Sequence, residues 1–172
     1  ALEIQAMAGT ERVYLLPTHL LPGYEYDAIV ETAERFRPRF DQLKLSRPLL
    51  GDTEMVRALA WVEMEQLPQM EGEAVLLVGH GTAHPGNLVY AALQGVFSLA
   101  GREDILVGTL EGWPELEDLL PILRRRSVER VRLVPLLLTA GTHVREDLVG
   151  TGPDSWKNRL ERAGFSVELK LE

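Results

Sequence analysis

The chain has 172 residues, of which 45% are hydrophobic, so it is long enough for one large domain or two small lobes with a packed core. Its formal net charge is −8 and its longest basic run is Arg124-Arg125-Arg126, which argues against a nucleic-acid partner. It contains no cysteine, so any metal site must use His, Asp or Glu. No apolar run approaches about 18 residues, and Ala1-Leu2-Glu3-Ile4 has neither the basic flank nor the apolar region of a signal peptide, so we expect a cytoplasmic protein without a membrane partner.

The first part of the chain alternates between helical and strand-like patterns. Gly9 ends the first helix, and a break at Pro68 to Gly72 closes this part. The predicted elements are, in chain order, a helix over residues 1–8, a strand over 13–17, a helix that buries Ile29, Ala33, Phe36 and Phe40, a strand over 43–45, and a helix from an Asp52 or Thr53 cap through Leu67 that buries Val56, Leu59 and Ala60.

The second part has the same alternation with stronger signals. Its best-specified helix has Pro114 in the first turn, acidic residues near its positive end and three arginines near its negative end. The predicted elements are a strand over 74–78, a helix over 86–100 that buries Leu88, Ala92, Val96 and Leu99, a strand over 105–110, the helix with buried Leu116, Leu119, Leu120 and Leu123, a strand over 131–138, a helix with Trp156, Leu160 and Ala163, and a strand over 165–171.

Strands that recur roughly every 30 residues with helices between them are typical of βαβ units and a parallel sheet. We therefore predict an α/β fold with two related lobes, each built from a parallel sheet flanked by helices. Residues 1–70 would form the C-terminal part of the first lobe plus a connecting helix. Residues 71–172 would form the second lobe and carry the functional site.

An internal repeat supports the two lobes. Residues 11–23 and 129–141 are identical at seven of thirteen positions, at a constant offset of 118. Each copy is followed by a predicted helix and strand, so we interpret them as the same strand-loop-helix unit. The alternative is a chance similarity between two apolar strands that each carry a Pro and a Gly. The strand at residues 74–78 has no counterpart in the first copy, so we expect the first lobe to be truncated at its N-terminus.

Polar side chains follow three predicted strands of the second lobe. The buried strand at 74–78 ends in the turn Gly79-His80-Gly81-Thr82, Glu111 follows the next strand, and His143 follows the strand at 131–138. Parallel strands deliver their carboxyl ends to one edge of a sheet, so these three side chains are expected to converge. Two imidazoles and a carboxylate suit a divalent transition metal. Taken alone, a histidine at a strand end is more often a hydrogen-bonded loop residue, and a glutamate before Gly-Trp-Pro is more often a turn or helix-capping residue.

Two further histidines are candidate ligands. His84 lies in the same loop as His80, and we favour a surface position for it over a ligand role. His19 follows the first-lobe strand and either points into a cleft between the lobes or caps a helix. The Gly79–Thr82 turn is also compatible with a phosphate at the following helix start, but it lacks the spacing of the standard phosphate loops.

At these residues the chain resembles the class II tetrapyrrole chelatases, in particular the cobalt chelatases of anaerobic cobalamin synthesis. The resemblance rests on Gly79-His80-Gly81, on Leu110 to Glu115, on Leu133 to His143, on Asp154 to Lys157 and on the loop from Leu20 to Tyr26. It covers nearly the whole chain. It implies two α/β lobes related by a pseudo-twofold axis, with a cleft between them.

The resemblance also implies an activity: insertion of cobalt(II), as a substrate metal, into sirohydrochlorin without a nucleotide. His80 and His143 would bind the metal and accept pyrrole protons, and Glu111 would hold the metal or orient a histidine. Sirohydrochlorin carries many carboxylates, so cations are expected along the cleft. Arg145 and Lys157 are candidates, although either is equally compatible with a surface position. We expect a homo-oligomer.

Three alternatives stay open. Iron or nickel chelatases of the same family would use the same ligands, so the sequence does not separate them from a cobalt chelatase. A non-catalytic carrier of metal or tetrapyrrole would bind without turnover. A flavodoxin-like module would bind an anion at the Gly79–Thr82 turn and would make no use of Glu111.

Overall fold

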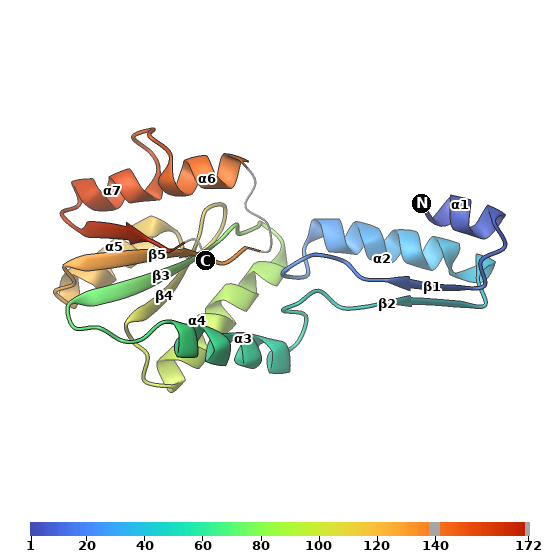
Figure 1. The fold of residues 1–172 in the computed structure, drawn as a ribbon, viewed down its shortest axis with the longest axis horizontal. Coiled ribbons are helices and arrows are strands. Elements are labelled where there is room, and N and C mark those ends of the chain that lie inside the picture. The colour runs from blue at the N-terminus through green and yellow to red at the C-terminus, as the bar shows by residue number, and fades with distance from the viewer. Residues whose placement is uncertain (138–141, 171–172) are drawn as a thin grey trace.

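The computed structural model of the chain describes residues 1–137 and 142–170, and the side chains of residues 142–145 lie outside the described part. The elements, shown in Figure 1, follow in chain order: α1 (Leu2–Met7), β1 (Arg12–Leu15), α2 (Tyr24–Phe36), the short 3₁₀ helix η1 (Arg37–Arg39), β2 (Gln42–Leu45), α3 (Thr53–Gln66), β3 (Glu73–Gly79), the 3₁₀ helix η2 (Pro85–Asn87), α4 (Leu88–Leu99), β4 (Ile105–Thr109), α5 (Leu116–Arg125), β5 (Arg130–Pro135), α6 (Thr142–Val149), α7 (Trp156–Arg162) and β6 (Ser166–Leu169).

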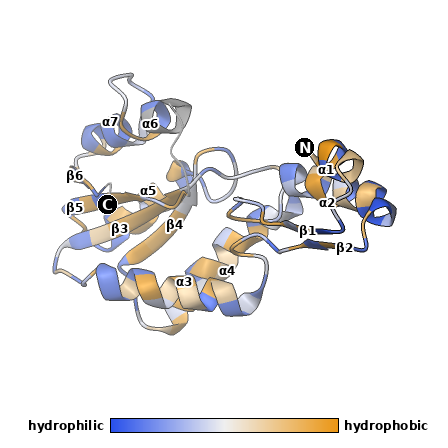
Figure 2. Ribbon diagram, turned by 45° about the vertical axis from the view of Figure 1, so that its right-hand side comes forward, coloured by the Kyte–Doolittle hydropathy of each residue, from blue (hydrophilic) through white to orange (hydrophobic). Residues whose placement is uncertain are grey.

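The larger lobe is a parallel sheet of four strands in the order β4-β3-β5-β6. Every residue of β3 is buried, because both faces of the sheet are covered by helices. Val75 and Leu77 of β3 pack with α3 and α4, whereas Leu76 and Val78 pack with α5 and α7. Figure 2 shows the apolar strands enclosed between these two helical layers. The period of two along β3 therefore divides the core into two halves.

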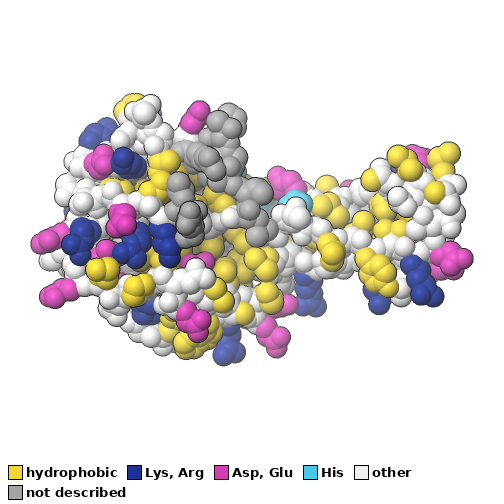
Figure 3. Space-filling view, viewed as in Figure 1, with side chains coloured by type: hydrophobic (Ala, Val, Ile, Leu, Met, Phe, Trp, Pro, Cys, Tyr) yellow, Lys and Arg dark blue, Asp and Glu magenta, His cyan; other side chains and the backbone are white. Residues whose placement is uncertain are grey.

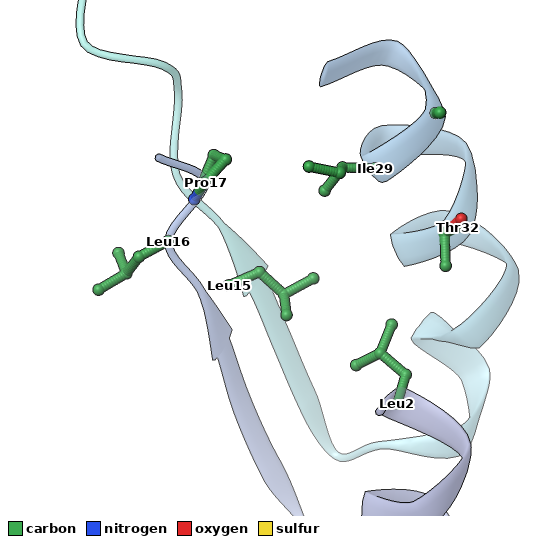
Figure 4. Close-up of a pocket in the computed structure, with 7 residues that line it drawn as sticks. Leu2, Leu15, Leu16, Pro17, Ile29 and Thr32 are labelled. Carbon is green, nitrogen blue, oxygen red and sulfur yellow. The ribbon is translucent and has the colours of Figure 1, made fainter. Parts of the chain in front are cut away.

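The smaller lobe is a two-stranded parallel sheet, β1-β2, covered by α1 and α2. Its small core contains Ala33, Phe40 and Leu43. Figure 3 shows this lobe as a narrow arm beside the larger one. An open apolar cavity of about 440 Å³ lies beside β1, and its lining includes Leu2, Leu15 and Ile29, which are drawn in Figure 4.

The expected α/β architecture with parallel sheets is confirmed, and the two repeat copies lie in the same topological context. β1 leads through α2 to its parallel neighbour β2, and β5 leads through α6 and α7 to its parallel neighbour β6. The registers match as well: Val13 pairs with Leu43 where Val131 pairs with Val167. Gly23 is the N-cap of α2, and its counterpart Gly141 lies outside the described residues.

The expected cap of α3 is also found, because the side chain of Asp52 accepts a hydrogen bond of 3.0 Å from the Met55 N–H. This helix contributes Val56 and Ala60 to the core that it shares with α4 and β3. The division of the chain at residue 70 stays a prediction. None of the described helices is long and apolar enough to cross a membrane.

Two helical faces were predicted wrongly. Phe40 is buried, but it lies beyond α2, because Pro38 sits in the 3₁₀ turn η1 that follows the helix. In α4 the buried residues are Tyr90, Leu93 and Phe97, whereas Leu88 and Leu99 are 69% and 91% exposed. This helix is apolar over most of its circumference, so the spacing of its apolar residues does not identify the buried face.

Two boundaries also differ from the prediction. Pro114 precedes α5, whose N-cap is Glu115 in a capping box with Asp118. The strand predicted over 131–138 ends at Pro135, and a helix, α6, occupies Thr142–Val149. His143 therefore lies in the first turn of a helix and does not follow the strand directly. Residues 142–149 contain Val144, Leu148 and Val149 as their only large apolar side chains, too few for a helical stripe.

Candidate functional site

A cavity of about 570 Å³ lies between the two lobes, at the carboxyl ends of β3 and β4. One wall comes from the β3 and β4 loops of the larger lobe and the other from the loop between β1 and α2. Figure 3 shows a histidine at the narrow neck between the lobes. The lining residues are Thr18, His19, Leu20, Leu21, Gly23, Tyr24, Glu25, His80, Gly81, Thr82, Ala83, Tyr90, Glu111 and Leu137.

His80 is the first residue after β3, so the most deeply buried strand of the sheet fixes its backbone. Its Nδ1 atom lies 3.1 Å from the carbonyl oxygen of Gly81. A carbonyl oxygen only accepts, so Nδ1 carries the proton in this contact. The lone pair of the neutral ring is then on Nε2, which is the arrangement found in histidines that bind metals.

Glu111 follows β4 and is held beside His80 by the backbone. The Leu110 N–H donates to the Gly79 carbonyl at 3.0 Å, and the Glu111 N–H donates to the His80 carbonyl at 2.7 Å. The Glu111 Oε2 atom lies 3.8 Å from His80 Nδ1. Because Nδ1 carries the proton, this distance places the Glu111 carboxylate on the Nδ1–H side of the His80 ring, where it can help to orient the ring.

The third predicted member, His143, has its side chain outside the described residues. Among the described residues, no group of three or more His, Asp or Glu side chains is arranged to hold a metal ion. The structure thus brings His80 and Glu111 together as the sequence predicts, and the complete three-residue site stays a prediction.

Glycines allow the two loops that carry this pair to pack backbone against backbone. Gly81 has φ of +84°, and a Cβ atom there would lie 2.8 Å from the Glu111 carbonyl carbon. A Cβ atom at Gly79 would lie 2.2 Å from the ring of Tyr90. Burial raises the pKa of the Tyr90 phenol, so its hydroxyl stays protonated under the Gly81 turn.

The Gly79–Thr82 turn has little capacity for a phosphate. The Gly81 N–H faces the Tyr90 hydroxyl at 3.4 Å, and the Thr82 N–H donates to the Asn87 side chain at 3.0 Å. Both donors that a phosphate would need are directed to side chains of the protein. This geometry disfavours the flavodoxin-like alternative.

His84, for which we favoured a surface position, is partly exposed and lies where the two lobes meet. Its side chain is only 18% exposed and reaches the smaller lobe, where Nε2 lies 3.1 Å from Asp27 Oδ2 and the ring packs edge-on against Tyr24 at 4.9 Å. Its Nδ1 atom accepts a hydrogen bond from the Gly86 N–H at 2.9 Å. Both ring nitrogens are engaged, so His84 has no lone pair free for a metal. It joins the two lobes.

His19 lies in the cleft, as one of its two predicted positions requires. Its buried Nδ1 atom has no hydrogen-bond partner within the described part of the chain. Glu25 and Tyr24, in the first turn of α2, line the same wall and were missed by the sequence analysis. Their sequence signals are their position just after the repeated loop, at Gly23, and their place in the Leu20 to Tyr26 segment of the family resemblance.

The predicted cations are not found where the structure describes the cleft. Lys157 lies on α7, 3.8 Å from Glu161 of the same helix, and is not among the lining residues. The Arg145 side chain lies outside the described residues. Glu25 and Glu111 instead make the described cleft wall acidic, which suits a metal cation better than a carboxylate-rich ligand.

The fold is shared with solved chelatase structures. The structure described as SirB from Bacillus subtilis with Fe3+ has a TM-score of 0.65 at 17% identity, covering 98% of this chain and 67% of that one. The sirohydrochlorin chelatase SirB from Bacillus subtilis subspecies spizizenii in complex with cobalt has a TM-score of 0.56 at 15% identity, covering 98% and 65%. The two-lobed architecture of this chain is therefore a chelatase fold.

The family model described as Cobalt chelatase (CbiK) matches residues 1–172, and the chain belongs to this family. It is 35% identical over 166 residues to the sirohydrochlorin cobaltochelatase of Salmonella typhimurium, covering 96% of the chain and 62% of the relative. It is 39% identical over 154 residues to the sirohydrochlorin cobaltochelatase CbiKC of Nitratidesulfovibrio vulgaris, covering 86% and 53%. The chain thus spans between half and two thirds of the length of these relatives.

Proposed function

We propose that this chain carries the metal-inserting part of a sirohydrochlorin cobaltochelatase, which places cobalt(II) in the tetrapyrrole without ATP. The observation that carries the proposal is that His80 and Glu111 lie side by side in a cavity of about 570 Å³, with His80 Nδ1 3.8 Å from Glu111 Oε2. The chain that holds this pair is a member of the cobalt chelatase family. The names of the two relatives supply the substrate.

The reaction needs a ligand for the metal and a base for two protons. Cobalt(II) enters the ring as two pyrrole N–H groups lose their protons, so the charge of the ring nitrogens balances that of the metal. Neutral imidazole is suited to both tasks, because it binds borderline metals and titrates near neutral pH. His80 presents Nε2 for one of these tasks, and we assign His143 to the other.

A carboxylate completes the proposed ligand set. Glu111 is our predicted ligand and lies nearest His80, but Glu25 lines the same cavity from the smaller lobe. Changing each to Gln keeps the shape and removes the charge, so the variant that loses more cobalt(II) affinity identifies the ligand. In the alternative role for Glu111, its carboxylate stabilises the Nδ1–H of His80 and thereby orients the ring.

The test is turnover with purified protein, cobalt(II) and sirohydrochlorin in the absence of nucleotide, followed through the absorbance of the tetrapyrrole. We expect many metallated products per protein molecule and a loss of at least about 10²-fold in rate in well-folded His80→Ala and His143→Ala proteins. A single stoichiometric binding event without turnover would support the carrier alternative. Parallel assays with iron(II) and nickel(II) compare the metals by kcat/KM.

A further inference from the structure

Asn87 links the two loops that carry the candidate metal pair. It is the last residue of η2, just before α4. Its Oδ1 atom accepts a hydrogen bond from the Thr82 N–H at 3.0 Å, two residues after His80. Its Nδ2 atom donates to the Trp113 carbonyl oxygen at 2.7 Å, two residues after Glu111. One amide therefore spans both loops.

The orientation of this amide is determined by its partners. A backbone N–H can only donate and a backbone carbonyl can only accept, so a flipped amide would lose both hydrogen bonds. The space around it is also matched to asparagine. A Cβ atom at Gly112 would lie 2.7 Å from Asn87 Oδ1 and 3.1 Å from the Thr82 nitrogen, so the glycine lets the amide approach both backbones.

We propose that Asn87 is a positioning residue that sets the separation of His80 and Glu111 and thereby the affinity of the cleft for cobalt(II). This inference rests on the proposed function. A metal site depends on the geometry of its ligands, and residues that orient ligands typically change metal affinity by about 10–100-fold when they are removed. Among the described residues, no hydrogen bond joins the Asn87 side chain to the side chain of His80 or Glu111. It acts through the backbone of their loops.

The test compares cobalt(II) affinity, measured by calorimetry, and the visible absorption of bound cobalt(II), which reports its coordination. We expect Asn87→Ala to weaken cobalt(II) binding by about 10–100-fold and to change the spectrum. Gln94→Ala is the matched control, because Gln94 also uses both ends of its amide, donating to the Ile105 carbonyl and accepting from the Val107 N–H. Gln94→Ala should lower the melting temperature and leave cobalt(II) affinity unchanged.

A second variant covers the case in which Asn87→Ala does not fold. Asn87→Asp keeps the acceptor for Thr82 and replaces the donor to Trp113 with a second oxygen. Measured at high salt, where the added charge is screened, it should bind cobalt(II) more weakly than the unaltered protein. An affinity equal to or above that of the unaltered protein would overturn the proposal.

A double-mutant cycle separates this inference from the proposed function. If Asn87 acts by positioning the pair, Asn87→Ala should have no further effect on cobalt(II) affinity in a His80→Ala background. Loss of affinity in His80→Ala with full affinity in Asn87→Ala would overturn the positioning role alone. Full affinity in His80→Ala would overturn both the proposed metal site and the role of Asn87.

Discussion

His19 and Leu137 occupy the same position of the two repeat copies, 118 residues apart, and both line the cleft between the lobes. Each of the two equivalent loops thus contributes a described residue to the cleft wall. The equivalent positions have diverged in chemistry. One carries an imidazole whose buried Nδ1 atom has no hydrogen-bond partner among the residues that the structure describes, and the other carries an aliphatic side chain.

His19→Leu would place the same side chain at both positions. We expect the free energy of unfolding to stay unchanged or to rise by up to about 1 kcal/mol, because a buried nitrogen without a partner is removed. His84→Leu is the contrasting variant, since both nitrogens of His84 are hydrogen-bonded, and it should lower the free energy of unfolding. Urea denaturation measures both. A clear loss of stability in His19→Leu would show that His19 has a structural partner.

The two histidines of the β3 loop should respond differently to cobalt(II). His80 lines the cleft and its Nε2 atom carries the lone pair, whereas the nitrogens of His84 are held by Asp27 and Gly86. We expect His80→Ala to weaken cobalt(II) binding by at least about 10-fold, and His84→Ala to leave it within about threefold. Calorimetric titration with cobalt(II) at constant pH measures both. A larger loss in His84→Ala than in His80→Ala would reverse the assignment.

Gly86 controls how closely the lobes approach each other. A Cβ atom there would collide with the carbonyl oxygen of Pro22 in the smaller lobe, at 1.7 Å. We expect Gly86→Ala to separate the lobes and to increase the radius of gyration measured by X-ray scattering. Gly95→Ala is the matched control, because a Cβ atom inside α4 at that position meets nothing within 4 Å. It should stabilise the protein by about 0.5–1 kcal/mol and leave the shape unchanged.

Tyr90 should make the protein sensitive to alkali. Burial raises the pKa of its phenol above the value of about 10 in an unfolded chain. Above pH 10 the unfolded state releases this proton while the folded state retains it, so the unfolded state binds fewer protons and stability falls as pH rises. We expect Tyr90→Phe to make this fall less steep between pH 10 and the raised pKa. Denaturant unfolding across this range measures it, with Tyr14→Phe, a change at an exposed tyrosine, as the control.

The positions of His80 and Glu111 were predictable from the sequence, because each residue follows a predicted strand. All strands of a parallel sheet run in the same direction, so the residues that follow them lie at the same edge of the sheet. The opposite wall was not predictable in the same way. Glu25 and Tyr24 reach the cleft through the packing of two lobes, which depends on contacts such as Gly86 with Pro22 that have no local sequence pattern.

The errors have related physical causes. The buried face of α4 was misassigned because Leu88 and Leu99 are as apolar as Leu93, so only tertiary packing decides which of them is buried. The contacts of His84 with Tyr24 and Asp27 were not predictable because they come from the other lobe. In each case the local sequence predicts the helix or loop, whereas contacts with distant segments decide which of its side chains are buried.

The exposure of the candidate metal pair has a kinetic consequence. The side chains of His80 and Glu111 are 50% and 66% exposed, unlike the ligands of a closed structural metal site. If this pair holds cobalt(II) as we propose, water molecules would fill the remaining coordination positions of the ion and would exchange readily with other donors. The residence time of the ion would then be short. Such a cleft would suit the transfer of cobalt(II) to the four nitrogens of a macrocycle better than its storage.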